Sequence, residues 1–553
     1  ASVSGSLARP GEMIVRGTLS FDGLEMEHPA FPKRVGADGD IDFSRSSLGS
    51  KGMAITFGSS RATVGFDADL VERTKLGNIR LDIDASLRME DLVQAETLEE
   101  MRAAGAIGLD LDIEGGASEL AALLPGEGAE PAAIGRAWRE ARLRGDISLT
   151  DAAFEPRGGA MGIKRLSGRA SLDGGGLKGV EVTFRLDGSP YSCKGSFTNI
   201  IPAALELMAV AREMEGGPVD DLAPMLRDMQ NVPDFDVTLE GRSLDLRPFE
   251  KQEIKEGAAT GAGRAAGASR PSAAANPFTL LALKKTRFTA RIDSVISTKA
   301  LFTEVDATGT IRDGLLVADP VTLRYAGGEG RARFEADLRR PQRIESRLDI
   351  SLEEVQAGRA LAAVHPLGKL LSGSFSFSSD ARFTSGPGVD PLASLSGTGS
   401  AFSSSGSLDI SPFIEPLTRS GLIDLSHISK LDFSEWRGNF LVRDGRFVTE
   451  SWTIESNRGD WSITGSFGLD GTIDYDARLV VPPAVQAQMK DLSKYRDLVD
   501  LFRDKEGNLV LDLDFAGTSK KPKVSLDMSR AKEKAAEKAR DELLDKAKNL
   551  FKK

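Results

Sequence analysis

The chain has 553 residues, a length that favours two or more domains, or a repeat array, over one ordinary core. Its 58 glycines, with only 4 Trp and 4 Tyr, are typical of many β-hairpins rather than of a helical bundle. The net charge of −11 argues against a surface that binds nucleic acid. Cys193 is the only cysteine, which excludes an intrachain disulfide and a cysteine-based metal site.

The first stretch, residues 1–250, is predicted to be a β-rich segment with helical inserts. Leu81, Ile83 and Leu87 alternate with polar residues, so one face of that strand is apolar and the other faces water. The dipeptides Asp22-Gly23 and Gly39-Asp40 predict turns between strands. Helical spacing or helix-favouring composition predicts inserts in both halves of the chain, over 90–104, 117–144, 201–229, 353–371, 412–436 and 483–502.

Residues 251–277 differ in composition from the rest of the chain. They consist mainly of Ala, Gly and Ser, and they cannot bury enough apolar area to offset the entropy of ordering. We expect a low-complexity linker here.

The second β-rich segment, residues 278–527, repeats the pattern of the first: alternating strands separated by turns that contain Gly or Asp. Asp313-Gly314 is a strong hairpin signal, because a type I′ turn needs φ > 0 at both central residues. Gly327-Gly328 and Pro341 mark the next two turns, while Asp444-Gly445 and Asp470-Gly471 mark later ones. A unit that consists of a glycine, a short strand and an Asp-Gly turn recurs along the chain with variable spacing. This weak repeat predicts one elongated sheet built from successive hairpins.

The tail, residues 528–553, is predicted to be a basic amphipathic helix. Ala536, Ala539, Leu543, Ala547 and Leu550 fall at helical spacing. From Arg530 onward there are nine Lys or Arg and five Asp or Glu, a charge of +4. Such a helix either lies on an anionic surface or partner, or is a solvated cap; both readings stay open.

Motifs for catalysis or cofactor binding are missing from the sequence. GAGRAAG (261–267) has the wrong spacing for a dinucleotide loop and follows no strand, and no P-loop, HExxH, GxSxG or EF-hand pattern is present. Asp82 with Asp84, and Asp512 with Asp514, lie on polar strand faces and are expected to be solvated. We therefore expect no enzyme, no cofactor and no metal.

Roughly two dozen strands at about 4.8 Å spacing would make a sheet on the order of 110 Å long. Its apolar face needs a cover. The sheet could close face to face over a dry core, or curl incompletely and leave an open apolar trough. Period-two alternation does not distinguish these outcomes.

The second half resembles the C-terminal region of the AsmA-like family. The resemblance rests on ATGTIRDGLLVADPVTLRYAGGEGRARFEADL (307–338), LDISLEEVQAGRALAAVHPLGKLL (348–371), FLVRDGRFVTESWTIES (440–456) and GSFGLDGTIDYDARLVV (465–481). It also includes LDLRPF (244–249) before the Ala-rich stretch and FAGTSKKPKVSLDMS (515–529) before the charged helix. The resemblance extends more loosely over 140–250.

This resemblance implies a bacterial envelope protein whose body lies in the periplasm. The implied fold is mainly β: an elongated, curved antiparallel sheet, a taco-like groove, built from repeated hairpins with helical inserts and a C-terminal amphipathic helix. The implied function is transport of phospholipids toward the outer membrane. Family members are usually held in the inner membrane by an N-terminal helix, and we expect such an anchor although this chain contains no apolar run of 18 residues. The family offers no catalytic residues to carry over.

We therefore expect a non-enzymatic protein that carries phospholipid acyl chains along an apolar β-groove between the inner and outer membranes. The alternative is an elongated periplasmic scaffold or assembly factor that docks outer-membrane β-proteins through a sheet edge and carries no lipid. Expected partners are phospholipids, the membrane and envelope proteins, not nucleic acid. The candidate groove residues are Leu81, Ile83, Leu87, Val182, Phe184, Leu186, Phe334, Leu338, Leu348, Ile350, Ile473, Tyr475, Leu479, Leu511, Leu513 and Phe515.

Overall fold

The structure is a computed structural model. It describes residues 2–4, 14–27, 33–71, 75–92, 101–122, 137–138, 140–156, 162–186, 188–213, 222–247, 277–298, 300–362, 370–386, 389–411, 415, 429–487, 496–518 and 521–550. The predicted linker at 251–277 lies outside these residues except for its last position, Pro277, which begins a helix.

Strands make up most of the described chain. They are β1 (Ser2–Ser4), β2 (Ile14–Met26), β3 (Val35–Ser44), β4 (Ser47–Phe57), β5 (Ser60–Val71), β6 (Lys75–Arg88), β7 (Met101–Gly116), β8 (Arg142–Pro156), β9 (Ile163–Asp173), β10 (Gly176–Leu186), β11 (Ser189–Thr198), β12 (Asp234–Asp245), β13 (Lys285–Ile296), β14 (Leu301–Arg312), β15 (Leu315–Tyr325), β16 (Gly328–Asp337), β17 (Ile344–Gln356), β18 (Leu371–Ser385), β19 (Ser396–Ser403), β20 (Gly406–Asp409), β21 (Lys430–Arg443), β22 (Arg446–Ser456), β23 (Asp460–Gly468), β24 (Thr472–Val481), β25 (Leu509–Thr518) and β26 (Lys521–Leu526). The helices are α1 (Met89–Leu92), α3 (Ala117–Ala122), α5 (Ile200–Glu213), α6 (Ala223–Asp228), α8 (Pro277–Lys284), α9 (Ala357–Ala362), α11 (Pro483–Gln486), α12 (Arg496–Phe502) and α13 (Ser529–Leu550).

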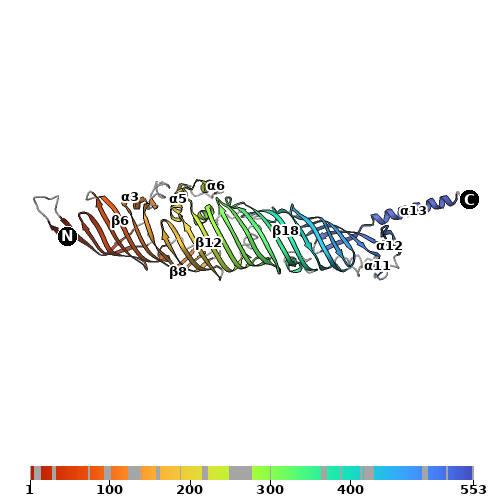
Figure 1. Ribbon diagram of the computed structural model, residues 1–553, viewed down its shortest axis with the longest axis horizontal. Coiled ribbons are helices and arrows are strands. Elements are labelled where there is room, and N and C mark those ends of the chain that lie inside the picture. Colours follow the sequence, from red (N-terminus) through yellow and green to blue (C-terminus); the bar gives the residue numbers. More distant parts are fainter. Residues whose placement is uncertain are drawn as a thin grey trace, which may run out of the picture.

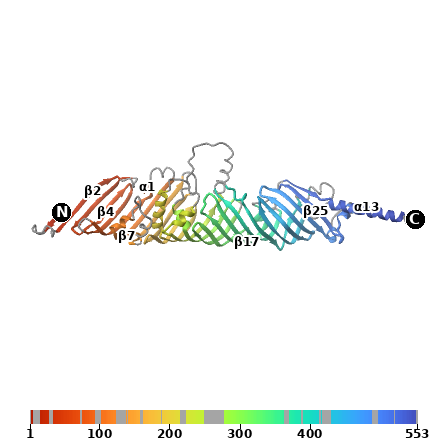
Figure 2. The ribbon, with the colours of Figure 1, turned by 90° about the horizontal axis from the view of Figure 1, so that it is seen from above.

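All 26 strands belong to one sheet. Each strand pairs with the next along the chain, except that β19 and β20 share one position between β18 and β21. The strands therefore follow one another in chain order along the long axis of the molecule, with the C-terminal helix beyond the last of them (Figures 1 and 2). This confirms the predicted fold class: mainly β, elongated, and built from successive hairpins.

The two β-rich halves join through the one parallel pair, β12 with β13. This pair differs from the antiparallel prediction. A parallel pair needs a crossover, and the chain between Asp245 and Lys285 connects the end of β12 to the start of β13. Val237 lies beside Phe288, so the apolar face continues across the junction.

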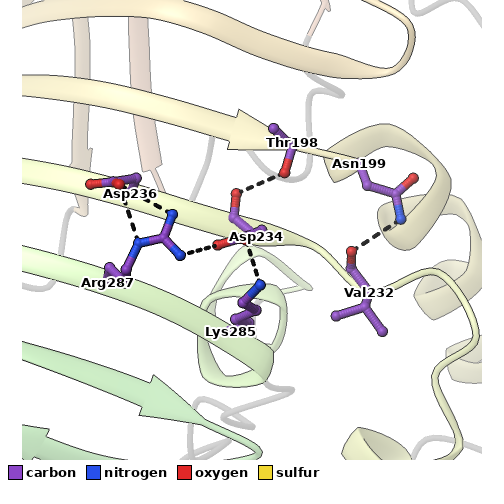
Figure 3. Close-up of polar contacts among 7 residues, drawn as sticks. All are labelled: Thr198, Asn199, Val232, Asp234, Asp236, Lys285 and Arg287. Atoms are coloured by element: carbon purple, nitrogen blue, oxygen red, sulfur yellow. Dashed lines mark hydrogen bonds and ion pairs between the residues drawn. The ribbon is translucent and has the colours of Figure 1, made fainter.

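On the other face, ion pairs link the two strands of this junction (Figure 3). Lys285 Nζ lies 2.5 Å from Asp234 Oδ2, and Arg287 Nη2 lies 3.2 Å from Asp236 Oδ2. Further along, Arg291 Nη1 lies 3.3 Å from Glu240 Oε1. Although each exposed pair contributes little energy, together they favour this register of β12 against β13.

Many strands contain β-bulges, where the pairing register shifts. The predicted turn at Asp22-Gly23 is wrong: both residues lie inside β2, at a register shift between Phe21 and Leu24, where Gly23 has φ = +66°. Gly39-Asp40 likewise lies inside β3. A bulge and a hairpin turn both use the positive φ that glycine tolerates, so the dipeptide does not tell them apart. Because a bulge bends its strand, the recurring bulges curve the sheet.

Several predicted turns are confirmed. Asp313 (φ +48°) and Gly314 (φ +78°) join β14 to β15, and Asp444-Gly445 joins β21 to β22 in the same way. The turn predicted at Gly327-Gly328 is centred one residue earlier, on Ala326-Gly327, because Gly328 already pairs with Tyr325.

Strands occupy the ends of several predicted helical inserts. Within the described residues, the range 90–104 begins with α1 and ends in β7 from Met101, and the range 117–144 begins with α3 and ends in β8 from Arg142. The last part of the insert expected over 412–436 is strand β21, while β17 and β18 take both ends of the one expected over 353–371. In each case residues with helix-favouring side chains are held as strand by pairing with their neighbours, so tertiary context overrides local propensity. The tail helix is confirmed as α13.

Buried side chains gather in three clusters along the sheet. One cluster lies at the C-terminal end, where α12 and the start of α13 pack against β18 and β21–β25. A second forms where α5, α6 and α8 cover the apolar face near the ends of β10–β12 and β14 and at Leu338, which directly follows β16. The third is small and centres on Trp138. Figure 1 shows α3, α5 and α6 along one edge of the sheet.

Candidate functional site

The candidate site is the apolar face of the sheet, and the strand registers show that it is continuous. Directly paired residues lie on the same face of a sheet. In the first half Phe66 pairs with Leu81 and Leu81 with Ile113. In the second half Ala318 pairs with Phe334, and Phe334 with Leu348. The apolar side chains thus form lengthwise rows that cross from strand to strand.

The opposite face carries cross-strand ion pairs. Arg80 Nη2 lies 3.1 Å from Asp112 Oδ2, Arg169 Nη2 lies 3.3 Å from Glu181 Oε2, and Arg347 Nη2 lies 2.6 Å from Asp380 Oδ2. Pairs this exposed contribute about 0–1 kcal/mol each, so they mark the solvated face more than they stabilise the fold.

The predicted groove residues divide by burial. Those between β6 and β17 that lie within strands are half-buried, so part of each apolar side chain remains accessible to solvent. They are Leu81, Ile83, Leu87, Val182, Phe184, Leu186, Phe334, Leu348 and Ile350. Ile473 and Tyr475 on β24 are also half-buried. This set keeps an accessible apolar surface over much of the molecule.

Other predicted groove residues are covered by the chain itself. Leu479 and Leu511 are 0% exposed and Leu513 is 1% exposed, all within the C-terminal cluster that includes Val499 and Phe502 of α12. Phe515 packs on the margin of that cluster, and Leu338 packs against the cluster formed by α5, α6 and α8. The sheet is therefore sealed near its C-terminal end, while the accessible stretch lies before it. The C-terminal part of the apolar face is thus covered by helices α12 and α13, whereas apolar side chains between β6 and β17 keep accessible surface.

Sequence reasoning included Phe184 but missed several other aromatic residues of this face, among them Tyr191 and Phe440. Phe184 stacks on Tyr191, with ring centroids 5.3 Å apart, and the Tyr191 hydroxyl donates a hydrogen bond to the Ser243 carbonyl oxygen at 2.7 Å. A second series follows β18, β21 and β22: Phe377 to Phe440 at 5.2 Å, Phe440 to Phe447 at 4.5 Å, and Phe447 to Trp452 at 6.0 Å. Phe447 and Trp452 lie five residues apart on β22, and they share this face only because the pairing register shifts between Thr449 and Trp452. A strict two-residue period therefore could not have identified both of them.

Glycines lie opposite several of these rings. Gly241 faces Tyr191, Gly309 faces Phe288, Gly399 faces Phe440 and Gly438 faces Trp452, each as a direct cross-strand partner. A Cβ at any of these glycines would overlap the facing ring. The absence of a side chain lets each ring lie across the neighbouring strand, and this explains part of the high glycine content.

A cluster of hydrogen bonds around Asp91, on helix α1, connects this helix to the sheet. The Asp91 side chain is buried, and it accepts hydrogen bonds from Lys33, from the Ser59 amide and hydroxyl, and from the Ser60 hydroxyl. Burial alone would raise the pKa of Asp91, but these hydrogen bonds outweigh it and hold the pKa well below its usual range. These hydrogen bonds connect α1 to the β4–β5 hairpin and to Lys33.

The described residues contain no group of three or more His, Cys, Asp or Glu that could hold a metal ion. Burial raises the pKa of the Cys193 thiol, which disfavours the nucleophilic thiolate. Of the helices in the described ranges, none is both long enough and apolar enough to cross a membrane. No family model matches the chain, and a search of curated proteins gives no match.

Proposed function

We propose that this protein is a non-enzymatic carrier of phospholipid acyl chains in the bacterial envelope, and that it supports outer-membrane biogenesis. The observation that carries the proposal is a row of directly paired, half-buried residues that runs from Leu87 on β6 to Ile350 on β17, in which Gly168 is the one member without a side chain. A monomeric soluble protein rarely leaves a contiguous apolar surface of this length without a use for it. The AsmA-like resemblance of the second half supports the same function and the placement in the periplasm, anchored to the inner membrane.

The binding energy in this proposal comes from burial rather than from a specific site. Each methylene removed from water contributes about 0.8 kcal/mol, so an acyl chain in contact with a few half-buried side chains would be held without any polar contact. Acyl chains in a bilayer are also removed from water. The free energy of moving an acyl chain between membrane and protein would therefore be close to zero. Direction would then need a gradient or a partner. Head groups would stay at the edge of the face, in water.

The proposal requires phospholipid to accompany the purified protein. The test is extraction from membranes followed by lipid mass spectrometry of the wild type and of the Phe184→Asp and Ile350→Asp variants. A charge on the apolar face should remove most of the bound lipid while circular dichroism still shows a folded sheet. Thr183→Asp is the matched control, because Thr183 is the exposed neighbour of Phe184 on the polar face. Wild-type protein without lipid, or equal loss in the control, would contradict the proposal.

A second function, a scaffold that docks another β-protein, is favoured by the free edge of β2. Within the described residues, β1 pairs only with Ile14–Arg16, which leaves the edge from Gly17 to Met26 without a strand partner. Leu19 is 53% exposed and Met26 is 48% exposed on this strand. An edge of this kind can accept a strand of another protein. Crosslinking from this edge to a protein partner, in material that carries no lipid, would favour the scaffold.

A further inference from the structure

The C-terminal helix α13 leaves the body of the protein. At its start, Ala531 is buried against the C-terminal cluster, the Ser529 amide donates a hydrogen bond to Asp527 Oδ1 at 2.8 Å, and Arg530 Nε lies 3.5 Å from Asp512 Oδ2. Beyond Lys534 every described side chain as far as Leu544 is exposed. Figure 1 shows the helix projecting past the end of the sheet. Among the described side chains of α13, those that contact the body lie in its first turns.

The projecting part carries apolar side chains that nothing in the described chain covers. Leu543 is 68% exposed and Leu544 is 48% exposed. Ala536 and Ala539 precede Leu543 at helical spacing, so they share its side of the helix. A helix that only caps the sheet needs no leucines at its solvated end, because exposed apolar area contributes nothing to folding.

The charge of this region indicates what would cover these leucines. The whole chain carries −11, yet the residues from Arg530 to the last lysine carry nine Lys or Arg and five Asp or Glu, a charge of +4. The last eight residues, KAKNLFKK, contain four lysines and no acid. Asp541, Glu542 and Asp545 flank the two leucines, so the positive charge is concentrated in the lysines that follow them. A cluster of lysines that directly follows apolar side chains matches an anionic lipid surface, where the ammonium groups reach the phosphates and the leucines enter the acyl boundary.

We infer that α13 docks the C-terminal end of the protein on an anionic bilayer and lies in the plane of the membrane interface. The helix has 22 residues and is therefore about 33 Å long, which suits an interfacial position. This inference is independent of the proposed acyl-chain carriage, since it concerns a helix outside the apolar face of the sheet.

Flotation of the full chain with lipid vesicles tests the inference. One set of vesicles is phosphatidylcholine alone, and the other contains about 30% phosphatidylglycerol. The full chain should float with the anionic vesicles and not with the neutral ones, and about 0.5 M salt should release much of it. Leu543→Asp should weaken binding on the order of tenfold, because it places a charge where the helix meets the acyl chains.

Ala535→Asp is the matched control. It adds the same charge to the same helix at an exposed position away from the two leucines, and it should change binding by no more than about twofold. Circular dichroism of both variants checks that the helix still forms. No flotation of the wild type, equal binding to neutral vesicles, or the same loss in both variants would overturn the inference. Self-association that Leu543→Asp abolishes, without vesicle binding, would also overturn it.

The lipid content of the same variants separates the two proposals. Leu543→Asp protein that no longer floats but still carries lipid would support docking through α13 and leave the carrier function intact. Protein that floats normally but never carries lipid would support docking and contradict the carrier function.

Discussion

Trp452 on β22 lies across Gly438, its direct cross-strand partner on β21. The indole N–H donates a hydrogen bond to the Asn439 carbonyl oxygen at 2.9 Å, which fixes the ring in this position. The pair shows how the apolar face is built: a large ring on one strand is accommodated by the missing side chain on the next.

Gly438→Ala should lower the free energy of unfolding by about 1–3 kcal/mol, because the added methyl group would overlap the Trp452 ring and force it out of place. Urea unfolding followed by tryptophan fluorescence measures the change. Gly65→Ala is the control, since a Cβ there would come no closer than 3.4 Å to any neighbour. Equal effects at both positions would show that the ring does not depend on the glycine.

Leu511→Ala should lower the free energy of unfolding by about 2–5 kcal/mol, because the side chain is fully buried in the C-terminal cluster and its loss leaves a cavity. Leu81→Ala should lower the free energy of unfolding clearly less, since Leu81 is only half-buried on the accessible stretch. Denaturant titrations of the two variants compare the sealed and the accessible parts directly. If Leu81→Ala were as costly as Leu511→Ala, the face at β6 would be a closed core.

Asp91→Asn should lower stability at neutral pH by about 2 kcal/mol, because it weakens the charge-assisted hydrogen bonds from Lys33, Ser59 and Ser60. The pKa of Asp91 is lower in the folded chain than in the unfolded chain. The stability that Asp91 contributes is therefore complete above the unfolded pKa of about 4 and disappears as the pH falls below it. Thermal melts of wild type and variant should converge in acid. The exposed Asp84→Asn on β6 is the control, and a constant gap between wild type and Asp91→Asn at every pH would contradict the account.

Glu206→Ala should loosen the connection between α6 and β12. The buried Glu206 carboxylate accepts hydrogen bonds from the Gln230 amide at 2.7 Å and from the Asn231 amide at 2.8 Å. Without it these amides lose their acceptor, and a buried unsatisfied donor costs about 1–3 kcal/mol. Hydrogen exchange should speed up at Gln230 and Asn231 while the amide of Val182 on β10 stays protected. Unchanged exchange at Gln230 and Asn231 would show that Glu206 does not hold this connection.

The sequence predicts the sheet well because its signals are local. Alternation in segments such as Leu81–Leu87 and turn chemistry at Asp313-Gly314 act within a few residues, and both reappear as strand and turn. Asp22-Gly23 shows the limit, since the same dipeptide serves a bulge inside β2. The parallel pairing of β12 with β13 depends on contacts across a long connection, which no local pattern specifies.

The candidate site could be predicted only in part, for a similar reason. Period two identifies which face Leu81 and Leu511 occupy, and both lie on the apolar face. The two-residue period does not say what covers that face. Leu511 is covered by helix α12, whereas Leu81 keeps an accessible surface. Lipid binding at the accessible residues stays a prediction.

Photocrosslinking to a phospholipid with a tagged acyl chain tests the central claim most directly. A benzophenone amino acid is placed in turn at Phe184 and Ile350 on the accessible face, at Thr183 on the polar face and at Leu513 in the sealed cluster. The account predicts crosslinks from Phe184 and Ile350 and none from Thr183 or Leu513. No crosslinks from the accessible face, or equal crosslinks from Thr183, would contradict it.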